Sequence, residues 1–508
     1  MSGTLTNIIL GLAGCDNHLM IASRDGISKI RYRILFQHAE KLAASFAHNG
    51  VRPRDTVLIQ LTSDLEHIVS FLALILLGAI PVSVKPGNMA DSTYHEYIEH
   101  IVGHFHLKWV FDLTESGRIR EALPRNQHAK RLLKSLTHMP LGSETAFVQF
   151  SSGSTSNPKP ISISHRAIYN NLTSIISIDE RSTSTVGFSF LPLSHDMGLV
   201  GGLLSNLLAK NTLLLVPTEY FLRAPIRWLR EAHGIGASIT AMPDFAFRYI
   251  ARQLRLFEAK STGEPLFEYF RTIYCGAEPI RFSTISEFIL QTTPLALEPS
   301  ALYFSYGLAE ATLVVTGHRF LSLEESFVRS GTSEPVACLG APVGNTEVSV
   351  TGGGDSSAHG RVQISGSSLF SGYGVHADCR FDGWLDTGDI GFIRAGNLYV
   401  CGREKEMIIV NGMNVYASDI ESAVMRRYPV KECIVLPDGN VYHMLLVERT
   451  VDIPVKNIAS HLVRIFGVAP LSIVAAKSSQ IVRTTSGKPM RNVMLQRLKH
   501  SDANAHNG

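Results

Sequence analysis

The segment 151–159 carries residue types that bind phosphate groups. It reads Ser151-Ser152-Gly153-Ser154-Thr155-Ser156-Asn157-Pro158-Lys159 and follows an apolar, strand-like stretch, Ala146–Phe150. Hydroxyls and exposed backbone N–H groups at this density can surround phosphate oxygens, and the lysine adds a positive charge. The spacing is not the G-x-x-x-x-G-K-[ST] of a Walker A loop, which argues against a P-loop NTPase or kinase. Seen alone, the segment is equally compatible with a solvated serine-rich turn.

A second segment, 303–312, combines an aromatic ring with a carboxylate. It reads Y-F-S-Y-G-L-A-E-A-T, so Tyr306 is followed by Gly307 and then by Glu310. A tyrosine next to a glycine can lay its ring under a flat base, and a glutamate a few residues on can hold a hard cation such as Mg²⁺. Seen alone, a buried aromatic residue at the end of a strand is the simpler explanation.

Three further segments lie toward the C-terminus. Asp389 ends a glycine-containing turn, where a carboxylate can accept hydrogen bonds from vicinal hydroxyls such as those of ribose. The stretch Gly402–Lys405 is basic and precedes the loop Val410–Tyr416. Lys488 follows a Thr-Thr-Ser-Gly turn, from which it can reach a distant site and stabilise developing negative charge. Seen singly, an ordinary turn, a basic loop and a surface lysine explain them more simply.

Together, and in this order, the five segments resemble the superfamily of adenylate-forming enzymes, which includes acyl-CoA synthetases, luciferases and the adenylation domains of peptide synthetases. The resemblance covers about residues 25–495. Finer stretches resemble the fatty acyl-AMP ligase branch: Phe190–Leu199, Pro243–Phe247, Gly276–Pro279 and Ala309–Thr312. Most members of the superfamily carry threonine where this chain has Ala309, whereas fatty acyl-AMP ligases typically carry alanine.

The resemblance implies which residues would contact ATP. In the loop that binds the β- and γ-phosphates these are Ser151, Ser152, Gly153, Ser154, Thr155 and Lys159. Tyr306 and Gly307 would lie against adenine, and another wall of that pocket would come from Gly276, Ala277 and Glu278. Asp389 and Arg403 would hold the ribose.

It also implies which residues would take part in the chemistry. Glu310 would bind Mg²⁺, and His195 would lie beside the acyl carboxylate. Lys488 would contact the α-phosphate and carboxylate oxygens during adenylation. Lys405 would be the hinge about which a small C-terminal domain turns.

The implied reaction is the ATP-dependent activation of a carboxylic acid, fatty or otherwise apolar, as acyl-AMP with release of pyrophosphate. The acyl group would then pass to a phosphopantetheine thiol, on coenzyme A or on an acyl carrier protein. A coenzyme A ligase for an aryl, polyketide or terpenoid acid is an alternative. A nucleotide-binding pseudoenzyme that serves as a scaffold is another, because Ser156 and Pro160 stand where the family commonly has glycines.

The surrounding pattern predicts an α/β fold in which helices alternate with largely parallel strands. We expect strands at Thr56–Leu61, Leu213–Val216 and Thr272–Tyr274, and helices at Leu65–Leu77 and Ile280–Gln291. The large N-terminal domain would span residues 1–402 as parallel-rich sheets packed with helices, with a small β-barrel-like subdomain at about 340–402. A small, mobile α+β lid domain would span residues 403–508.

Composition supports a globular enzyme. The 508 residues are 45% hydrophobic and 18% charged, and the formal net charge of +3 gives no reason to expect a nucleic-acid partner. The six cysteines form no C-x-x-C pair, which is typical of a reduced, cytoplasmic protein without a zinc site. The apolar run Ile68–Val84 contains Gly78 and Pro81, so a buried helix followed by a buried strand is favoured over a transmembrane segment. His100 and His104 could face one another on a surface helix, but no acidic ligand pattern completes a metal site.

Overall fold

The chain is described here by a computed structural model. It describes residues 3–84, 86–87, 91–107, 109–111, 140–150, 159–256, 263–329, 335–352, 359–375, 383–410, 413–447, 455–483 and 489–505. The predicted phosphate loop residues Ser151–Thr155 and the predicted catalytic residue Lys488 lie outside these ranges.

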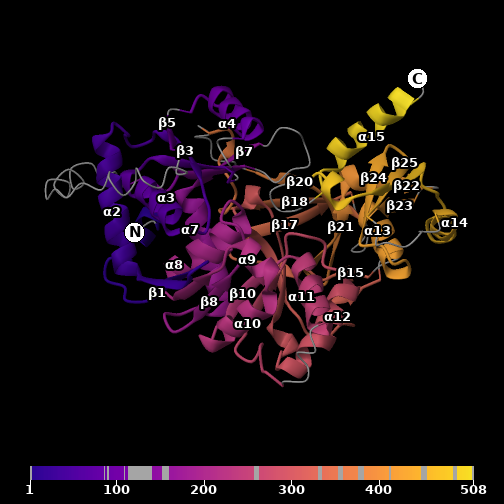
Figure 1. Cartoon of the computed structure of the whole chain (residues 1–508), viewed down its shortest axis with the longest axis horizontal. Helices are drawn as coiled ribbons and strands as arrows, with labels where there is room; N and C mark the ends of the chain where they lie inside the picture. Colours follow the sequence, from indigo (N-terminus) through magenta and orange to yellow (C-terminus); the bar gives the residue numbers. More distant parts are fainter. Residues whose placement is uncertain are drawn as a thin grey trace.

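Two mostly parallel sheets form the body of the molecule (Figure 1). In order across the larger sheet, its nine strands are β16 (Ala341–Pro342), β13 (Val314–Arg319), β12 (Leu302–Gly307), β11 (Thr272–Cys275), β10 (Ile239–Met242), β8 (Val186–Ser189), β9 (Thr212–Leu215), β1 (His18–Ser23) and β2 (Gly26–Arg31). The six strands of the other are β19 (Gly372–Tyr373), β7 (Pro160–Ser164), β6 (Thr145–Phe150), β4 (Ile80–Val84), β3 (Thr56–Gln60) and β5 (Trp109–Phe111). The strands expected near residues 56, 213 and 272 are all present.

Helices cover these sheets, as near-continuous apolar strands require. Every residue of β3 and of β4 is buried. The helices are α1 (Leu5–Leu10), α2 (Tyr32–His48), α3 (Leu65–Leu77), α4 (Ser92–His104), α7 (His165–Asp179), α8 (Ser205–Ala209), α9 (Thr218–Arg223), α10 (Pro225–Gly234), α11 (Asp244–Leu256) and α12 (Phe282–Thr292). The α/β prediction is therefore confirmed, including the helix at Leu65–Leu77.

The apolar run at 68–84 is interior structure. Helix α3 ends at Gly78, whose φ of 80° caps the helix in the left-handed region, and buried strand β4 follows. Among the residues described, none of the helices has the length and apolar character needed to span a membrane.

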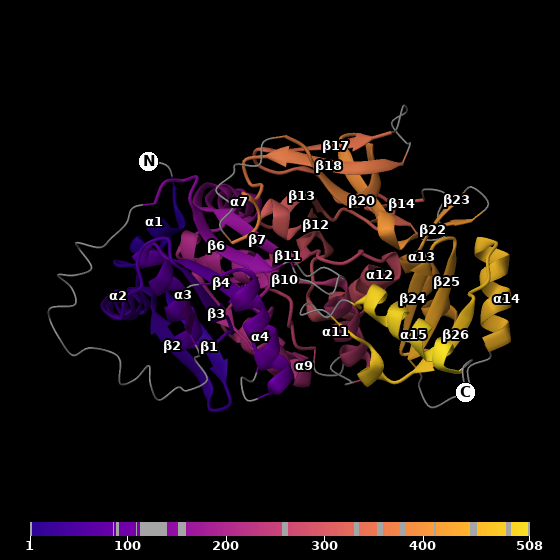
Figure 2. The same cartoon turned by 90° about the horizontal axis from the view of Figure 1, so that it is seen from above.

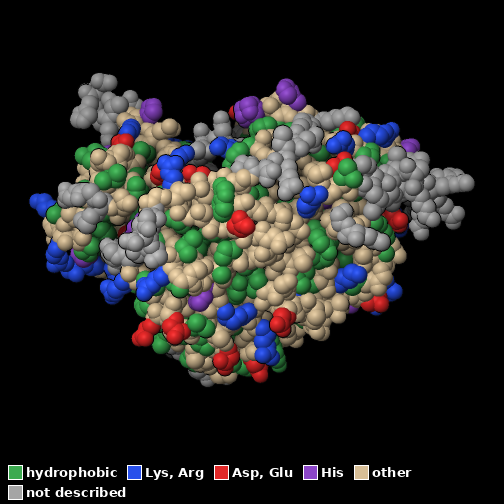
Figure 3. All heavy atoms as spheres, turned by 180° about the vertical axis from the view of Figure 1, so that it is seen from behind, with side chains coloured by type: hydrophobic (Ala, Val, Ile, Leu, Met, Phe, Trp, Pro, Cys, Tyr) green, Lys and Arg blue, Asp and Glu red, His purple; other side chains and the backbone are tan. Residues whose placement is uncertain are grey.

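The histidines of α4 lie on the surface. The rings of His100 and His104 stack with centroids 5.5 Å apart. Histidine side chains gather at the upper edge of the molecule in Figure 3. Both side chains are exposed, as expected for a surface helix. Among the described residues, no group of histidine, cysteine and acidic side chains could hold a metal ion.

A third, antiparallel sheet follows the two larger ones, where the β-rich subdomain was expected. Its four strands are β17 (Thr346–Thr351), β18 (Gly360–Gly366), β20 (Leu385–Arg394) and β21 (Asn397–Arg403). Figure 2 shows this sheet at the junction between the large body and the C-terminal residues. Before it, the short pair β14 (Phe327–Val328) and β15 (Val336–Ala337) is anchored by Phe327, whose ring packs edge-on against Phe282 and Phe304.

The C-terminal part, residues 404–505, has sheets and hydrophobic clusters of its own. It contains β22 (Met407–Val410), β23 (Met413–Tyr416), β24 (Glu432–Asp438), β25 (Val441–Val447), β26 (Ser472–Ala476), α13 (Ala417–Arg427), α14 (Val455–Phe466) and α15 (Arg491–Ala505). Its two apolar clusters include only residues from Ile408 onward, whereas the clusters of the large part stop at Cys401. The domain boundary at 402/403 stays a prediction, and this separation of cores supports it.

A buried ion pair joins α7 to the nine-stranded sheet. Arg181 contacts Asp179 at 2.6 Å, and each side chain is only 1% exposed. Arg181 also donates to Ser205, and the Tyr274 hydroxyl on β11 donates to Asp179 at 2.9 Å. The carboxylate is tolerated inside the protein because these partners compensate its charge.

Arg181→Ala should therefore destabilise the large part by about 3–5 kcal/mol, since it leaves the Asp179 charge buried without its ion-pair partner. Thermal unfolding followed by circular dichroism should show a melting temperature lower by several degrees. Asp16→Ala is the matched control, because it breaks the exposed Arg33–Asp16 pair (3.2 Å), which contributes about 1 kcal/mol or less. Equal shifts for the two variants would contradict the prediction.

Candidate functional site

Asp389 lies between Tyr306 and Arg403, and these three residues form the centre of the site, here called the Asp389 cluster. The Tyr306 hydroxyl donates to Asp389 Oδ2 at 2.6 Å, and Arg403 Nε lies 3.1 Å from Asp389 Oδ1. Tyr306 comes from β12 of the nine-stranded sheet, whereas Asp389 and Arg403 are paired in register on β20 and β21. Three residues expected to surround a nucleoside are thus in direct contact, although 97 positions separate the first from the last.

The cluster is electrostatically compensated. Asp389 is 4% exposed, so its negative charge needs nearby donors. Burial raises the pKa of Tyr306 well above its ordinary value, and the Asp389 charge raises it further. The hydroxyl is therefore a donor throughout the neutral pH range. Asp389 in turn raises the pKa of Arg403. A carboxylate oxygen can accept more than one hydrogen bond, which is the chemistry that binding of ribose hydroxyls would need.

Gly276 lets the β11–β12 ends approach closely. A Cβ at Gly276 would lie 2.8 Å from Ser305 Oγ and 2.9 Å from the Ser305 carbonyl oxygen, so a larger residue would force the strands apart. Ala277 adopts a φ of 65°, and Glu278 turns away to accept the Phe245 backbone N–H at 3.0 Å. The predicted adenine wall 276–278 therefore lies beside residue 305, next to Tyr306.

A tight turn after β12 positions Glu310. A Cβ at Gly307 would lie 1.7 Å from the Leu313 carbonyl oxygen, which makes glycine necessary there. Thr312 has φ 68° and ψ −56°, a strained conformation for a β-branched residue. Its hydroxyl donates to the Ser368 carbonyl at 2.7 Å, and the Phe370 N–H donates to the Glu310 carbonyl at 2.8 Å. The strain is thus held two positions after a predicted metal ligand, Glu310.

Tyr373 contacts both Glu310 and Lys159, the last residue of the predicted phosphate loop. Its hydroxyl donates to Glu310 Oε1 at 2.9 Å, and Lys159 Nζ lies 4.8 Å from the centroid of its ring. Burial and the Glu310 carboxylate both raise the pKa of Tyr373, so the hydroxyl stays a donor. Glu310 also contributes to the raised pKa of Arg403, which places its charge near the Asp389 cluster.

His195 lies two positions before an eight-residue π-helix, η1 (Met197–Leu204), a distortion often found at functional sites. The His195 carbonyl accepts the Leu199 N–H at 2.7 Å. A Cβ at Gly201 would contact Leu313 at 3.1 Å, so η1 packs against the turn that carries Glu310. The predicted position of His195 beside an acyl carboxylate stays a prediction.

Lys405 lies in a 3₁₀ turn, η6 (Glu404–Glu406), between the last strand of the third sheet and β22. It lies two positions after Arg403 of the Asp389 cluster and three positions before Ile408, the first residue of the C-terminal hydrophobic clusters. The hinge role of Lys405 stays a prediction, as do the roles of Lys488 and Ser151–Thr155.

Comparison with known proteins decides the family. A family model for AMP-binding enzymes matches residues 15–374, more than half of the chain. The chain belongs to the AMP-binding enzyme family. With this family comes its enzyme class, the acyl-adenylate-forming ligases, with ATP as the nucleotide substrate.

Two curated relatives and a solved structure match most of this chain. The long-chain-fatty-acid–AMP ligase FadD32 of Mycolicibacterium smegmatis is 26% identical over an alignment 466 positions long, which covers 78% of this chain and 72% of that protein. The 4-hydroxyphenylalkanoate adenylyltransferase of Mycobacterium tuberculosis is 26% identical over an alignment 525 positions long, which covers 88% of this chain and 83% of that protein. A solved structure from a study of fatty acyl-adenylate ligases of E. coli and L. pneumophila has a TM-score of 0.86 and 22% identity, covering 99% of each chain.

The sequence of this AMP-binding enzyme did not point to Tyr373. A lone tyrosine in the stretch Ser371–Gly374 carries no chemical signature, and only its pairing with Ile161 across β19 and β7 brings it to Glu310 and Lys159. The signal that could have found it is its aromatic ring next to glycines, the same feature that singled out Tyr306.

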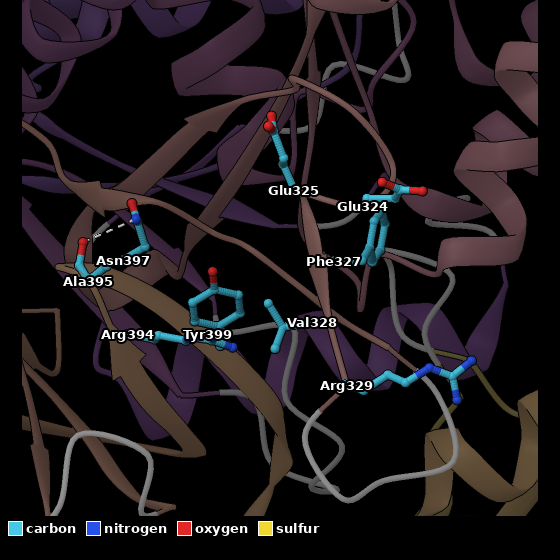
Figure 4. A pocket seen from close by; sticks show the side chains of 9 residues that line it. All are labelled: Glu324, Glu325, Phe327, Val328, Arg329, Arg394, Ala395, Asn397 and Tyr399. Carbon is cyan, nitrogen blue, oxygen red and sulfur yellow. Dashed lines mark hydrogen bonds between the residues drawn. The ribbon is translucent and has the colours of Figure 1, made fainter.

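A cavity of about 510 Å³ lies away from these residues (Figure 4). It opens between β14 and the β20–β21 turn, and its lining includes Glu324, Phe327, Arg329, Arg394, Asn397 and Tyr399. No member of the Asp389 cluster lines this cavity. The Asp389 cluster is therefore chosen as the candidate site for its residue types and contacts and not for a cavity volume.

Tyr306→Phe should weaken ATP binding by about tenfold, because it removes the hydroxyl that donates to the buried Asp389 carboxylate but keeps the ring. Isothermal titration with ATP gives the dissociation constant. Tyr306→Ala, which also removes the ring, should weaken binding further. Unchanged affinity in the phenylalanine variant would mean that this hydrogen bond does not organise the nucleotide site.

Proposed function

We propose that this enzyme activates a fatty or other apolar carboxylic acid as acyl-AMP and transfers the acyl group to a phosphopantetheine thiol. The observation that carries the proposal is the convergence of the Asp389 cluster with Glu310. Tyr306 on β12, Asp389 on β20 and Glu310 in the turn after β12 would supply a ring for the base, an acceptor for ribose hydroxyls and a carboxylate for a cation.

In the first half-reaction a carboxylate oxygen of the acid attacks the α-phosphorus of ATP. A bond forms between that oxygen and phosphorus, the bond from phosphorus to the bridging oxygen breaks, and pyrophosphate leaves. Two anions must approach each other, so positive charge and positioning matter more than a general base. Asp389 and Arg403 would fix the ribose, Tyr306 the adenine, and Lys488 would stabilise the charge that develops on the α-phosphate.

Glu310 fits a magnesium site. It supplies a hard carboxylate oxygen, and its hydrogen bond from Tyr373 holds the side chain in place while leaving the second oxygen available. Mg²⁺ commonly uses one or two protein carboxylates and takes its other ligands from phosphates and water. When bound, the ion would neutralise phosphate charge.

In the second half-reaction the sulfur of a phosphopantetheine thiol attacks the acyl carbonyl carbon. The carbon–oxygen bond to phosphate breaks, the thiol loses its proton, and AMP leaves as a thioester forms. Rotation of the C-terminal part about Lys405 would withdraw Lys488 and bring the 410–416 loop to the site. The thiol belongs to coenzyme A or to an acyl carrier protein.

The acid is proposed from the resemblance to fatty acyl-AMP ligases and from the likeness to FadD32. The apolar residues Phe190 and Phe247 are fully buried core side chains, and Phe245 is partly buried. An aryl acid is a second candidate, because the 4-hydroxyphenylalkanoate adenylyltransferase covers the larger share of this chain.

One experiment separates these functions. The protein is incubated with ATP, Mg²⁺ and a panel of fatty and aryl acids, with either coenzyme A or a holo carrier protein, and products are identified by mass spectrometry. We expect acyl-AMP with fatty acids and a thioester with one acceptor. Products from aryl acids alone would favour the second candidate, and no adenylate from any acid would favour the pseudoenzyme alternative.

Glu310→Gln should raise the Mg²⁺ concentration needed for half-maximal pyrophosphate exchange by about tenfold or more, because it removes the charge while keeping an acceptor for Tyr373. Tyr373→Phe is the matched control. It keeps the carboxylate and removes only the hydroxyl, so its shift should be several times smaller. A larger shift in the control would move the metal-binding role away from Glu310.

Lys488→Ala should slow adenylate formation by about 10²–10³-fold, the scale for one lost transition-state donor. Transfer from preformed acyl-adenylate to the thiol should change much less, since Lys488 would have left the site. Rapid-quench measurement of each half-reaction tests this. Equal losses in both would contradict the proposed rotation.

A further inference from the structure

A chain of charged side chains connects the large part to the C-terminal part. Arg281 is the residue just before α12, at the end of the loop that begins with the predicted adenine wall 276–278. Its Nη2 lies 3.7 Å from Oε2 of Glu421 on α13. The other oxygen of Glu421 accepts a hydrogen bond from Arg491 at 2.5 Å. Arg491 Nε also lies 3.3 Å from Oε2 of Glu406, the residue that follows Lys405.

These groups are largely removed from water. Glu421 is 6% exposed, Arg491 12% and Arg281 20%. Burial acts to lower the pKa of Arg491, but Glu421 and Glu406 outweigh it and raise that pKa. Ion pairs shielded from solvent are screened less than surface pairs, so they influence how the two parts sit together.

The chain ends close to the predicted catalytic lysine. Arg491 is the first residue of α15 and lies three positions after Lys488, within about 11 Å along even a fully extended chain. Arg483 and Pro489 form a β-bridge, so the described ends on either side of 484–488 are held together. Figures 1 and 2 show the start of α15 toward the large part and its end pointing away. The base of the lysine-bearing segment is thus tethered through Glu421 to the adenine-wall loop.

We propose that Arg281 is a positioning residue that holds the C-terminal part in the orientation required for adenylate formation. This rests on the proposed function, in which Lys488 acts in the first half-reaction only. The Arg281–Glu421 contact joins the two parts directly and must break when the C-terminal part rotates about Lys405. Glu421–Arg491 and Glu406–Arg491 lie within the C-terminal part and move with it.

Glu421 keeps donors of its own when this contact breaks. It retains Arg491, and the Val435 N–H donates to it at 2.9 Å. The loop end that carries Arg281 stays attached to the large part, because the Arg281 backbone N–H donates to Asp244 at 3.0 Å. Burial raises the pKa of Asp244, and the Arg281 charge counteracts that rise. A contact of this kind can bias an equilibrium without locking it.

The neighbouring interface is loosely filled. A cavity of about 540 Å³ lies along α12 and reaches Arg426 on α13, with Phe282, Ser286 and Glu287 among its lining. Arg281 bridges the two parts at the opposite end of α12 from Thr292. Since a cavity rather than packed side chains lies along this side of α12, the ion pair can carry a sizeable share of the orientation preference.

The test is Arg281→Gln with two readouts. Adenylate formation should fall about tenfold, whereas transfer from preformed acyl-adenylate should stay within about twofold of wild type. The second readout needs no activity: fluorescent labels on cysteines placed at exposed positions Leu290 of α12 and Val463 of α14, with other accessible cysteines replaced by serine. The distance distribution between the labels should shift or broaden in the variant.

Arg248→Gln is the matched control. Arg248 lies 3.8 Å from the same Asp244 carboxylate but is on α11, and its side chain is 48% exposed. If Arg281 acted only as a counter-ion for Asp244, both variants would change the half-reactions alike and leave the label distances as in wild type. That result would overturn the proposal, as would an unaltered first half-reaction in Arg281→Gln.

Arg281→Lys is the control that separates loss of the positive charge from a folding defect. It keeps a positive charge between Asp244 and Glu421 and should recover most of the adenylation rate and the wild-type label distances. No recovery in a variant with the wild-type melting temperature would contradict the role of charge. If wild-type enzyme formed no adenylate at all, the proposed function would fail, while the label distances would still decide whether Arg281 sets the orientation.

Discussion

The candidate site depends on the compensation of one buried negative charge. Asp389 is almost fully buried, and a carboxylate in that position is costly unless donors surround it. Tyr306 and Arg403 supply the donors from different sheets. The third sheet must therefore dock on the end of β12 before the charge is satisfied, and the same docking creates the surface proposed for the nucleoside. Assembly of the fold and formation of the site are one event.

The turn after β12 adds the second requirement. Its backbone is held by Gly307, which can approach Leu313 only without a side chain, and by the unusual conformation of Thr312. Strain of this kind costs about 1–3 kcal/mol and persists only where the surroundings fix it. Hydrogen bonds to Ser368 and Phe370 do so here. The result directs Glu310 toward Tyr373 and Lys159, on the side where the phosphate loop ends.

Local sequence features predicted individual helices, strands and candidate site residues. Which of these residues contact one another is decided by long-range packing. Continuous apolar stretches identified α3, β3 and β9 because interior elements in parallel sheets need apolar residues on both faces. The turn residues identified Tyr306, Glu310 and Asp389. What no local pattern contained was the pairing of Tyr373 with Glu310, or of Arg281 with a glutamate 140 positions later. Such pairs follow from the packing of whole elements.

Pro160 illustrates the same point. Because proline has no N–H to donate and stands where the family commonly has glycine, we expect Pro160 to weaken phosphate binding. As the first residue of β7, it instead sits where a strand tolerates proline, opposite Phe150, and its carbonyl accepts the Gly374 N–H at 2.9 Å. The proline thereby helps to dock β19, which carries Tyr373. Its effect on ATP stays a prediction, but its role in the sheet is structural.

The two charged clusters differ in a way that suits an enzyme with two half-reactions. Two partners of the Asp389 carboxylate, Tyr306 and Arg403, lie in the large part on strands that end before Lys405, so the proposed rotation about Lys405 would leave these contacts intact. Glu421 instead divides its oxygens between the two parts, with Arg491 on one side and Arg281 on the other. Only the second arrangement can sense orientation, because only there does a contact exist in one orientation and not in another. On the proposed roles, the Asp389 cluster would hold the nucleoside in both half-reactions, and the Glu421 contacts would favour the orientation for the first.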